Sequence, residues 1–187
     1  YGVGVFKGSQ FAKVTINGSI IGNYAFSGCT TIKELILTDK VRTIGDLAFN
    51  GCTGLSKTVI GSGVTSTGTD CYGAFDSCTG ELIMNSNIPD APATGTSYRG
   101  LFGKSSFSKI TIGEGVTYVG RYAFQYSGCK NYYFMATKPP VLFSTSAFTG
   151  VSNPVIYVPE SAVSAYQSAN GWSTYSDSII GYDFSQD

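Results

Sequence analysis

Residues 44–55 read I-G-D-L-A-F-N-G-C-T-G-L, and the phenylalanine of this stretch recurs along the chain. Successive copies are spaced by 23, 26, 27, 22 and 24 residues, at Phe26, Phe49, Phe75, Phe102, Phe124 and Phe148, and Phe6 adds one more copy. A steady mean spacing with irregular steps is typical of stacked coils whose loops vary in length. The 187 residues are therefore expected to form one repeat solenoid of about seven coils.

An alternating apolar pattern follows each phenylalanine. After Phe26 it comprises Ile32, Leu35 and Leu37, and the last two positions have the period of two that marks one face of a short β-strand. Another aliphatic residue stands four positions after the strand, and in several units a glycine follows it, at Gly45, Gly68 and Gly120. We expect one short parallel strand in each coil, then a tight turn in which this glycine takes a positive φ.

Composition excludes several classes of function. Hydrophobic residues make up 42% of the chain, enough for a continuous core, whereas charged residues make up only 13%. Twelve basic and twelve acidic residues give no net charge, so nucleic acid is not an expected partner. Histidine is absent, which removes the commonest general base and metal ligand. No apolar run approaches the roughly 18 residues of a membrane span, so direct membrane insertion is not expected.

The unit resembles the BspA-like leucine-rich repeat, whose motif is I-G-x-x-A-F-x-x-C-x-x-L. Residues 21–32 and 44–55 match it closely, and residues 119–129 match it with an insertion. Thr67 and the pair Gly100-Leu101 depart from it. The resemblance implies a leucine-rich-repeat solenoid with turn or short helical segments between strands. It also implies surface display, adhesion or host interaction in bacteria, and it supplies no catalytic residues.

The C-terminal part of the chain has the pattern of a cap. Residues 159–166 read P-E-S-A-V-S-A-Y, and proline and glutamate suit the first turn of a helix. Asn170-Gly171 can end that helix. Because the last coil of a solenoid would otherwise expose its core, we expect a repeat region at residues 1–158 and a cap at 159–187, with a single helix over about 160–170.

Four of the five cysteines, Cys29, Cys52, Cys78 and Cys129, fall at or near one repeat position that faces the core. A free thiol packs as a small apolar group, so we expect them to be buried and reduced. One disulfide between neighbouring coils, or a metal site, is the alternative. Cys71 lies in an insertion and is the thiol expected to react if it is exposed. No metal or cofactor is expected.

Outward positions of the strands form two rows. One row alternates in charge through Lys13, Glu34, Lys57, Glu81 and Lys109. The other is mostly apolar and aromatic, and comprises Thr15, Ile36, Val59, Ile83, Thr111, Tyr133 and Tyr157. An exposed apolar row on a sheet favours a binding surface, although β-propensity alone can also fill such positions. Ile36, Val59, Ile83, Tyr133 and Tyr157 are therefore candidate ligand-binding residues.

Two neighbouring coils carry insertions. The step from the aliphatic residue after the strand to the phenylalanine is eight residues in regular units, but eleven from Val64 to Phe75 and fourteen from Ile88 to Phe102. Both insertions leave the solenoid at the same repeat position, where binding loops are common, although each can also be a tolerated excursion. They add these candidates for ligand binding: Asp70, Tyr72, Asp90, Tyr98 and Arg99.

These features predict a non-catalytic, monomeric module that binds a host or matrix protein at the cell surface or in the extracellular space. A glycan-binding module, free or attached to a larger secreted protein, is the alternative, since tyrosines stack on sugars as well as on proteins. A β-helix polysaccharide hydrolase is a remote third reading, in which Asp70 and Asp90, or Glu81 beside another acid, would supply paired carboxylates. No motif fixes such a pair.

Overall fold

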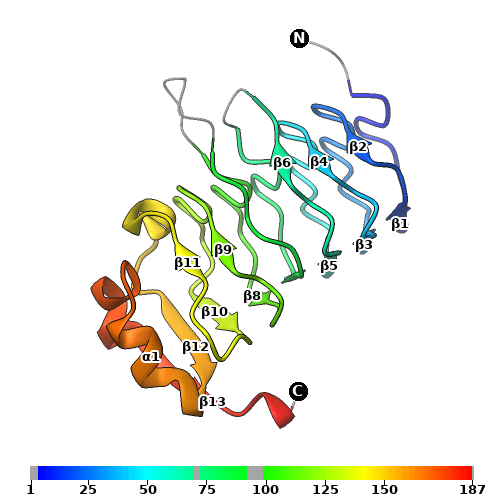
Figure 1. Cartoon of the computed structure of the whole chain (residues 1–187). Coiled ribbons are helices and arrows are strands. Elements are labelled where there is room, and N and C mark those ends of the chain that lie inside the picture. Colours follow the sequence, from blue (N-terminus) through cyan, green and yellow to red (C-terminus); the bar gives the residue numbers. More distant parts are fainter. Residues whose placement is uncertain (1–3, 70–71, 92–98, 187) are drawn as a thin grey trace.

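The fold is a solenoid in which successive coils stack side by side (Figure 1). The structure is a computed structural model, and it describes residues 4–69, 72–91 and 99–186. Short strands line one long side of the solenoid, and the C-terminal helices lie over its last coil. The predicted leucine-rich-repeat solenoid is confirmed.

One side of the solenoid is an eight-stranded sheet in which all neighbours are parallel. Its strands, in spatial order, are β1 (Lys13–Ile16), β3 (Glu34–Leu37), β5 (Lys57–Ile60), β7 (Glu81–Met84), β8 (Lys109–Ile112), β10 (Asn131–Phe134), β12 (Val155–Pro159) and β13 (Ile179–Tyr182). The first seven belong to the seven coils that the phenylalanine spacing predicts. The eighth, β13, comes from the C-terminal region and was not expected from the sequence.

Most coils carry a second, two-residue strand where the sequence suggested only a turn. Three of these strands pair with one another, β2 (Ile20–Ile21), β4 (Thr43–Ile44) and β6 (Ser66–Thr67). Two more pair farther along, β9 (Tyr118–Val119) and β11 (Val141–Leu142). The two groups form a minor sheet on a second side of the solenoid, interrupted between β6 and β9.

Glycines after these short strands have a different role from the one predicted. The expected positive φ is wrong for Gly45, Gly68 and Gly120, since the glycines with positive φ lie elsewhere, as at Gly51 (φ 71°). Each of the three instead presses its backbone against the preceding coil. A Cβ on Gly45 would lie 2.5 Å from Oδ1 of Asn23, too close for any real contact. Glycine is needed here for close coil stacking.

The phenylalanines form a continuous ladder through the core. Ring centroids of neighbouring coils lie 5.0 Å apart for Phe6 and Phe26, 5.4 Å for Phe26 and Phe49, and 5.0 Å for Phe49 and Phe75. The ladder continues to Phe148 with steps between 5.2 and 5.9 Å. Offset stacking adds to the burial of these rings, so the ladder joins the coils into one core.

The cap closes the C-terminal end. It begins with 3-10 helix η2 (Glu160–Ala162) and continues as α1 (Val163–Ser168) and η3 (Trp172–Ser178) before β13. Within the predicted range of 160–170, only residues 163–168 are therefore α-helical. Trp172 is fully buried against Phe134, with ring centroids 4.9 Å apart, and its Nε1 donates to the carbonyl of Pro140 at 2.7 Å. Two further 3-10 helices are η1 (Thr145–Phe148) and η4 (Phe184–Gln186).

Candidate ligand-binding surfaces

The outer face of the main sheet carries the apolar row in the predicted register. Each strand places one of its side chains beside its counterpart on the next strand, through Thr15, Ile36, Val59, Ile83, Thr111, Tyr133, Tyr157 and finally Ile180. Ile36, Val59 and Ile83 are only partly exposed. Neighbouring strands are about 4.8 Å apart, so adjacent side chains cover one another.

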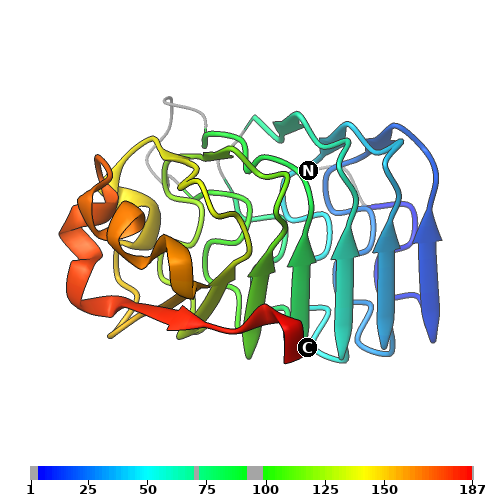
Figure 2. The same cartoon turned by 60° about the horizontal axis from the view of Figure 1, so that its bottom comes forward.

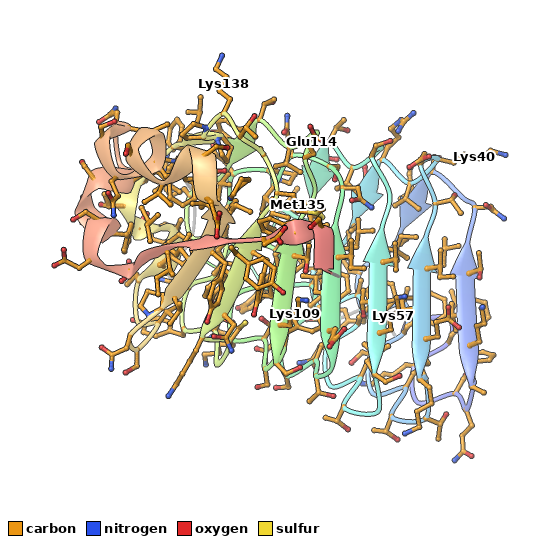
Figure 3. The ribbon with its side chains drawn as sticks, turned by 90° about the horizontal axis from the view of Figure 1, so that it is seen from below. Lys40, Lys57, Lys109, Glu114, Met135 and Lys138 are labelled. Atoms are coloured by element: carbon orange, nitrogen blue, oxygen red, sulfur yellow. The ribbon has the colours of Figure 1, made fainter. Side chains whose placement is uncertain are left out.

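The charged row runs beside it in register from Lys13 to Lys109. Lys57 and Lys109 project from β5 and β8 on this face (Figure 3). Nζ of Lys13 lies 2.9 Å from Oε2 of Glu34, and both side chains are well exposed. Such a pair stabilises the fold by less than about 1 kcal/mol. The row therefore serves the alignment of neighbouring strands and the solubility of this face more than the stability of the fold.

The C-terminal segment covers the aromatic end of the apolar row. It leaves the cap as β13 and passes over the strands of the last coils (Figure 2). Tyr133 stacks on Tyr157 at 4.5 Å between centroids, and Tyr182 and Phe184 lie edge-on against Tyr133 at 5.1 and 6.4 Å. Nζ of Lys109 lies 4.5 Å from the centroid of the same ring. Two predicted binding tyrosines are thus packed in an aromatic cluster within the chain.

The insertions lie where the minor sheet is interrupted. Among the described residues, β6 pairs only with β4, and Ile88 forms its bridge with Val119 on the far side. A cavity of about 410 Å³ lies at this interruption, lined by Ser62, Val64, Thr65, Asn87, Pro89, Asp90 and Tyr118. Of the predicted insertion residues, Tyr72 is 39% exposed, while Asp70 and Tyr98 lie outside the described residues.

Asp90 is held by the next coil. Its Oδ1 accepts from the amide of Arg121 at 2.7 Å, and its Oδ2 accepts from the hydroxyl of Tyr118 at 2.8 Å. Burial, followed by this hydrogen bond to a carboxylate, raises the pKa of Tyr118 to about 12. The Tyr118 hydroxyl therefore stays protonated at neutral pH and remains a donor to Asp90. This arrangement favours a structural role for a carboxylate that the sequence suggested for ligand binding.

Arg99 is also engaged within the chain. Its Nη1 lies 3.2 Å from Oδ2 of Asp76, and the two side chains are 22% and 14% exposed. The hydroxyl of Ser77 donates to Oδ1 of the same carboxylate at 2.8 Å. The pair ties the end of the longer insertion to the preceding coil.

Sequence reasoning missed a set of side chains whose oxygens accept hydrogen bonds from backbone amides of the next coil. Oδ1 of Asn23 accepts from the amide of Asp46 at 2.9 Å, and Oδ1 of Asp46 accepts from the amide of Tyr72 at 3.2 Å. Oδ1 of Asn87 accepts from the amide of Thr117 at 2.8 Å. Asp90 belongs to this set. For Asn23 and Asp46 the signal was present as an Asn or Asp at one repeat position, directly after Gly22 and Gly45. Asp90 occupies the same position two residues after Ile88, whereas Asn87 lies three residues before it.

Four cysteines form a row of free, buried thiols, as predicted. Sγ of Cys29, Cys52 and Cys78 donates to the phenylalanine carbonyl of the preceding coil, at 3.0, 3.2 and 3.0 Å. Burial raises the pKa of Cys129 to about 11 and also raises that of Cys78. Cys71 lies outside the described residues. Within the described part of the chain, no three His, Cys, Asp or Glu side chains converge as a metal site would require.

Comparison with known families accounts for nearly the whole chain. A family model described as BspA type leucine-rich repeat region matches in six copies, over residues 2–131 and 94–169. No curated protein matches the chain. In the described residues, no helix is both long enough and apolar enough to span a membrane.

Proposed function

The chain belongs to the BspA-type leucine-rich repeat family, and we propose that it is a non-catalytic module that binds a host or matrix protein at a bacterial surface or in secreted form. The family suggests a protein-binding repeat module, is generally non-enzymatic and is typically surface-associated in bacteria. The observation that carries the proposal is the apolar row on the outer sheet face, which is in strand register and partly exposed at Ile36, Val59 and Ile83.

Ile36, Val59 and Ile83 form the centre of the proposed contact. They lie on three adjacent strands, and Glu34, Lys57 and Glu81 accompany them in the charged row. An apolar strip with charges of both signs along one edge resembles the core and rim of protein interfaces. A partner would bury the strip and orient itself through the charges.

A pull-down with the purified chain from host extracellular proteins would identify the partner, and its affinity can then be measured. Val59→Thr and Ile83→Thr should keep the β-branched shape and weaken binding at least tenfold, or about 1.4 kcal/mol. Val141→Thr is the matched control, since Val141 is 60% exposed on β11 of the minor sheet. Equal affinity for the two outer-face variants and the wild type would contradict the proposed site.

A glycan ligand is the second candidate, and the cavity beside Asp90 favours it. Tyr118 lines that cavity, its ring lies 6.0 Å from that of Phe143, and Arg121 lies over Phe143 at 5.0 Å. Aromatic faces next to polar groups suit sugar rings. A glycan array distinguishes the candidates: binding that Phe143→Ala abolishes and Ile83→Thr leaves intact would favour the glycan.

A polysaccharide hydrolase is the remote alternative. It would require turnover that Asp70→Ala or Asp90→Ala removes. Both Asp90 oxygens accept hydrogen bonds from Tyr118 and Arg121, so this carboxylate already joins its coil to the next one. We therefore propose that the module acts by binding alone.

A further inference from the structure

The fourth coil is shorter than its neighbours at the corner between the main sheet and the minor sheet. In the second, third and fifth coils, the second residue of the minor strand stands seven positions after the end of the main strand, as Ile44 stands after Leu37. In the fourth coil, Ile88 pairs with Val119 in the same register but stands only four positions after Met84. Three residues of turn are therefore missing from this coil.

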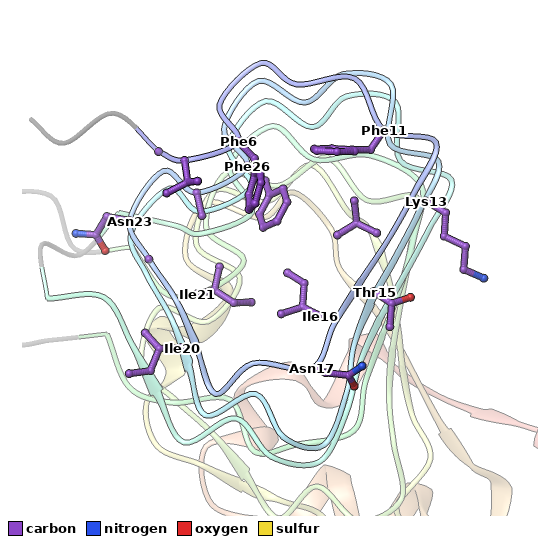
Figure 4. Close-up of a pocket in the computed structure, with 15 residues that line it drawn as sticks. Phe6, Phe11, Lys13, Thr15, Ile16, Asn17, Ile20, Ile21, Asn23 and Phe26 are labelled. Carbon is purple, nitrogen blue, oxygen red and sulfur yellow. The ribbon is translucent and has the colours of Figure 1, made fainter.

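The cavity of about 410 Å³ described above lies where this turn is cut short. Its lining includes Thr65 of the third coil, Asn87 and Pro89 of the fourth coil and Tyr118 of the fifth coil. Tyr118 is the first residue of β9, as Ile20 is of β2, and Ile20 points away from the core (Figure 4). The ring of Tyr118 therefore projects from the minor sheet beside the cavity.

The short turn leaves the carbonyl of Thr65 without the partner that its counterparts have. The carbonyl of Ser19 accepts from two amides of the next coil at 2.8 and 3.1 Å, and that of Arg42 accepts from two at 2.9 and 3.1 Å. In the described part of the chain, no donor reaches the carbonyl of Thr65. Because ladder carbonyls point towards the neighbouring strand, this one points towards the fourth coil and the cavity.

Asn87 supplies a donor in the same cavity. Its Oδ1 accepts from the amides of Thr117 and Tyr118 at 2.8 and 3.1 Å and from the hydroxyl of Thr117 at 3.3 Å. These three donors fix the orientation of the side-chain amide, so Nδ2 is its free end. Nδ2 carries two N–H donors, and neither has an acceptor among the residues that the structure describes. The cavity thus offers one free acceptor and one free donor.

An acetamido group matches this pair. Its N–H can donate to the carbonyl of Thr65, as amides of the next coil do to Ser19 and Arg42, and its carbonyl can accept from Nδ2 of Asn87. Val64 and Pro89 give the lining an apolar part that suits the methyl group. Pro89 has no backbone N–H, so it cannot itself donate to the third coil.

The rest of the cavity favours a sugar over a peptide. Tyr118 offers an aromatic face, and its hydroxyl and the carboxylate of Asp90 can bond to ligand hydroxyls. The volume lies near the lower end of the range of roughly 300–1,000 Å³ for small-ligand sites, which suits one compact ring better than an extended chain. The carboxylate of Asp90 disfavours an acidic sugar, because like charges would meet.

We propose that this cavity binds a neutral N-acetylated hexosamine, with the acetamido group between the carbonyl of Thr65 and Nδ2 of Asn87 and the sugar ring against Tyr118. The inference rests on the glycan candidate proposed above and names the class of sugar. It assigns the specificity to the short turn of the fourth coil, because a full-length turn would fill this space with main chain.

The test compares two disaccharides that share one linkage. Di-N-acetylchitobiose carries acetamido groups where cellobiose carries hydroxyls. Di-N-acetylchitobiose should bind at least tenfold more tightly in calorimetry, and it alone should move the ¹³C resonance of the Thr65 carbonyl. Asn87→Asp keeps an oxygen for the amides of Thr117 and Tyr118 but removes the N–H donor, so the preference should disappear. Asn17→Asp makes the same change at an exposed residue of the first coil and should keep the preference.

Four outcomes would overturn the proposal. Equal affinities for the two disaccharides, or a Thr65 carbonyl resonance that does not move, would refute the acetamido contact. Tighter binding of a blocked diglycine than of di-N-acetylchitobiose would assign the cavity to a peptide. If neither disaccharide binds while another glycan does, this inference fails and the glycan candidate stands. The protein contact is judged separately by Ile83→Thr, since Ile83 lies on β7 of the main sheet and does not line the cavity.

Discussion

The ring of Tyr182 lies edge-on against the ring of Tyr133, 5.1 Å between centroids, so the last strand covers the aromatic end of the outer apolar row. Tyr182→Ala should reduce the free energy of unfolding by about 1 kcal/mol or more, the scale of one aromatic pair. Exchange at the β13 amides should become faster. Denaturant unfolding measures the first effect, with Tyr72→Ala as control because Tyr72 is 39% exposed. Equal losses in both variants would show that the cluster adds no stability.

Thr58 stands at a core position that is apolar in other coils. Its side chain is fully buried, and among the described residues its Oγ1 has no hydrogen-bond partner. Thr58→Val keeps the shape and removes the unsatisfied hydroxyl, so it should stabilise the protein by about 1 kcal/mol. Thr111→Val, on the outward face of β8, should change stability by less than about 0.5 kcal/mol. A destabilised Thr58→Val variant would imply a partner for the hydroxyl, such as a buried water.

Gly45 tests whether close coil stacking, rather than turn conformation, requires glycine. Gly45→Ala should destabilise by about 1–3 kcal/mol, since the new methyl group would overlap Asn23. Gly18→Ala is the control, because a Cβ there meets nothing within 4 Å and its φ is not positive. Thermal unfolding of the two variants gives the comparison. Similar thermal midpoints for the two variants would mean that neighbouring coils can move apart to accept the methyl group at little cost in free energy.

Thiol titration tests the buried row. In denaturant, at least four thiols per chain should react, because Cys29, Cys52, Cys78 and Cys129 are free. In the native protein near pH 8, these four should react slowly, since access is blocked and burial raises the pKa of Cys129 to about 11. Any fast native reaction is expected at Cys71. Recovery of three thiols in denaturant would instead indicate one disulfide.

The repeat spacing predicted the coils, the strand register and the buried thiols, because each depends on one position recurring in every unit. The row from Lys13 through Glu34 to Lys57 could be aligned from the sequence alone for this reason. Features that occur once could not be predicted. The packing of Tyr182 on Tyr133 joins residues far apart in the sequence, and the repeat pattern gives no sign of it because it occurs in one place only.

Asp90 shows the same limit within the candidate site. Its place in an insertion suggested ligand binding, but its contacts with Tyr118 and Arg121 depend on how the next coil stacks. The role of Gly45 was likewise hidden, because residue type alone does not separate a positive φ from a close approach. The contacts of a candidate residue therefore separate a structural role from a ligand-binding role better than its position in the sequence does.

The final prediction concerns the hypothesis that the 69–73 and 86–99 insertions form a ligand-contacting lobe. Asn87 and Asp90 bond to the next coil, and Arg99 pairs with Asp76, so these residues should be kept. Replacing residues 92–98 with two glycines should therefore leave the solenoid folded, as circular dichroism and thermal unfolding can show. If the lobe contacts the ligand, affinity for the partner from the pull-down should fall at least tenfold, or about 1.4 kcal/mol.

Matched variants separate the lobe from the outer sheet face. Tyr72→Ala should weaken binding together with the shortened loop, because Tyr72 lies within the other insertion, 69–73, and is 39% exposed. If Tyr72→Ala and the shortened loop leave the affinity unchanged while Ile83→Thr lowers it, the contact lies on the outer face of β7 and the lobe is ruled out. Losses in the loop variants and in Ile83→Thr together would require a partner that spans both sides of the solenoid.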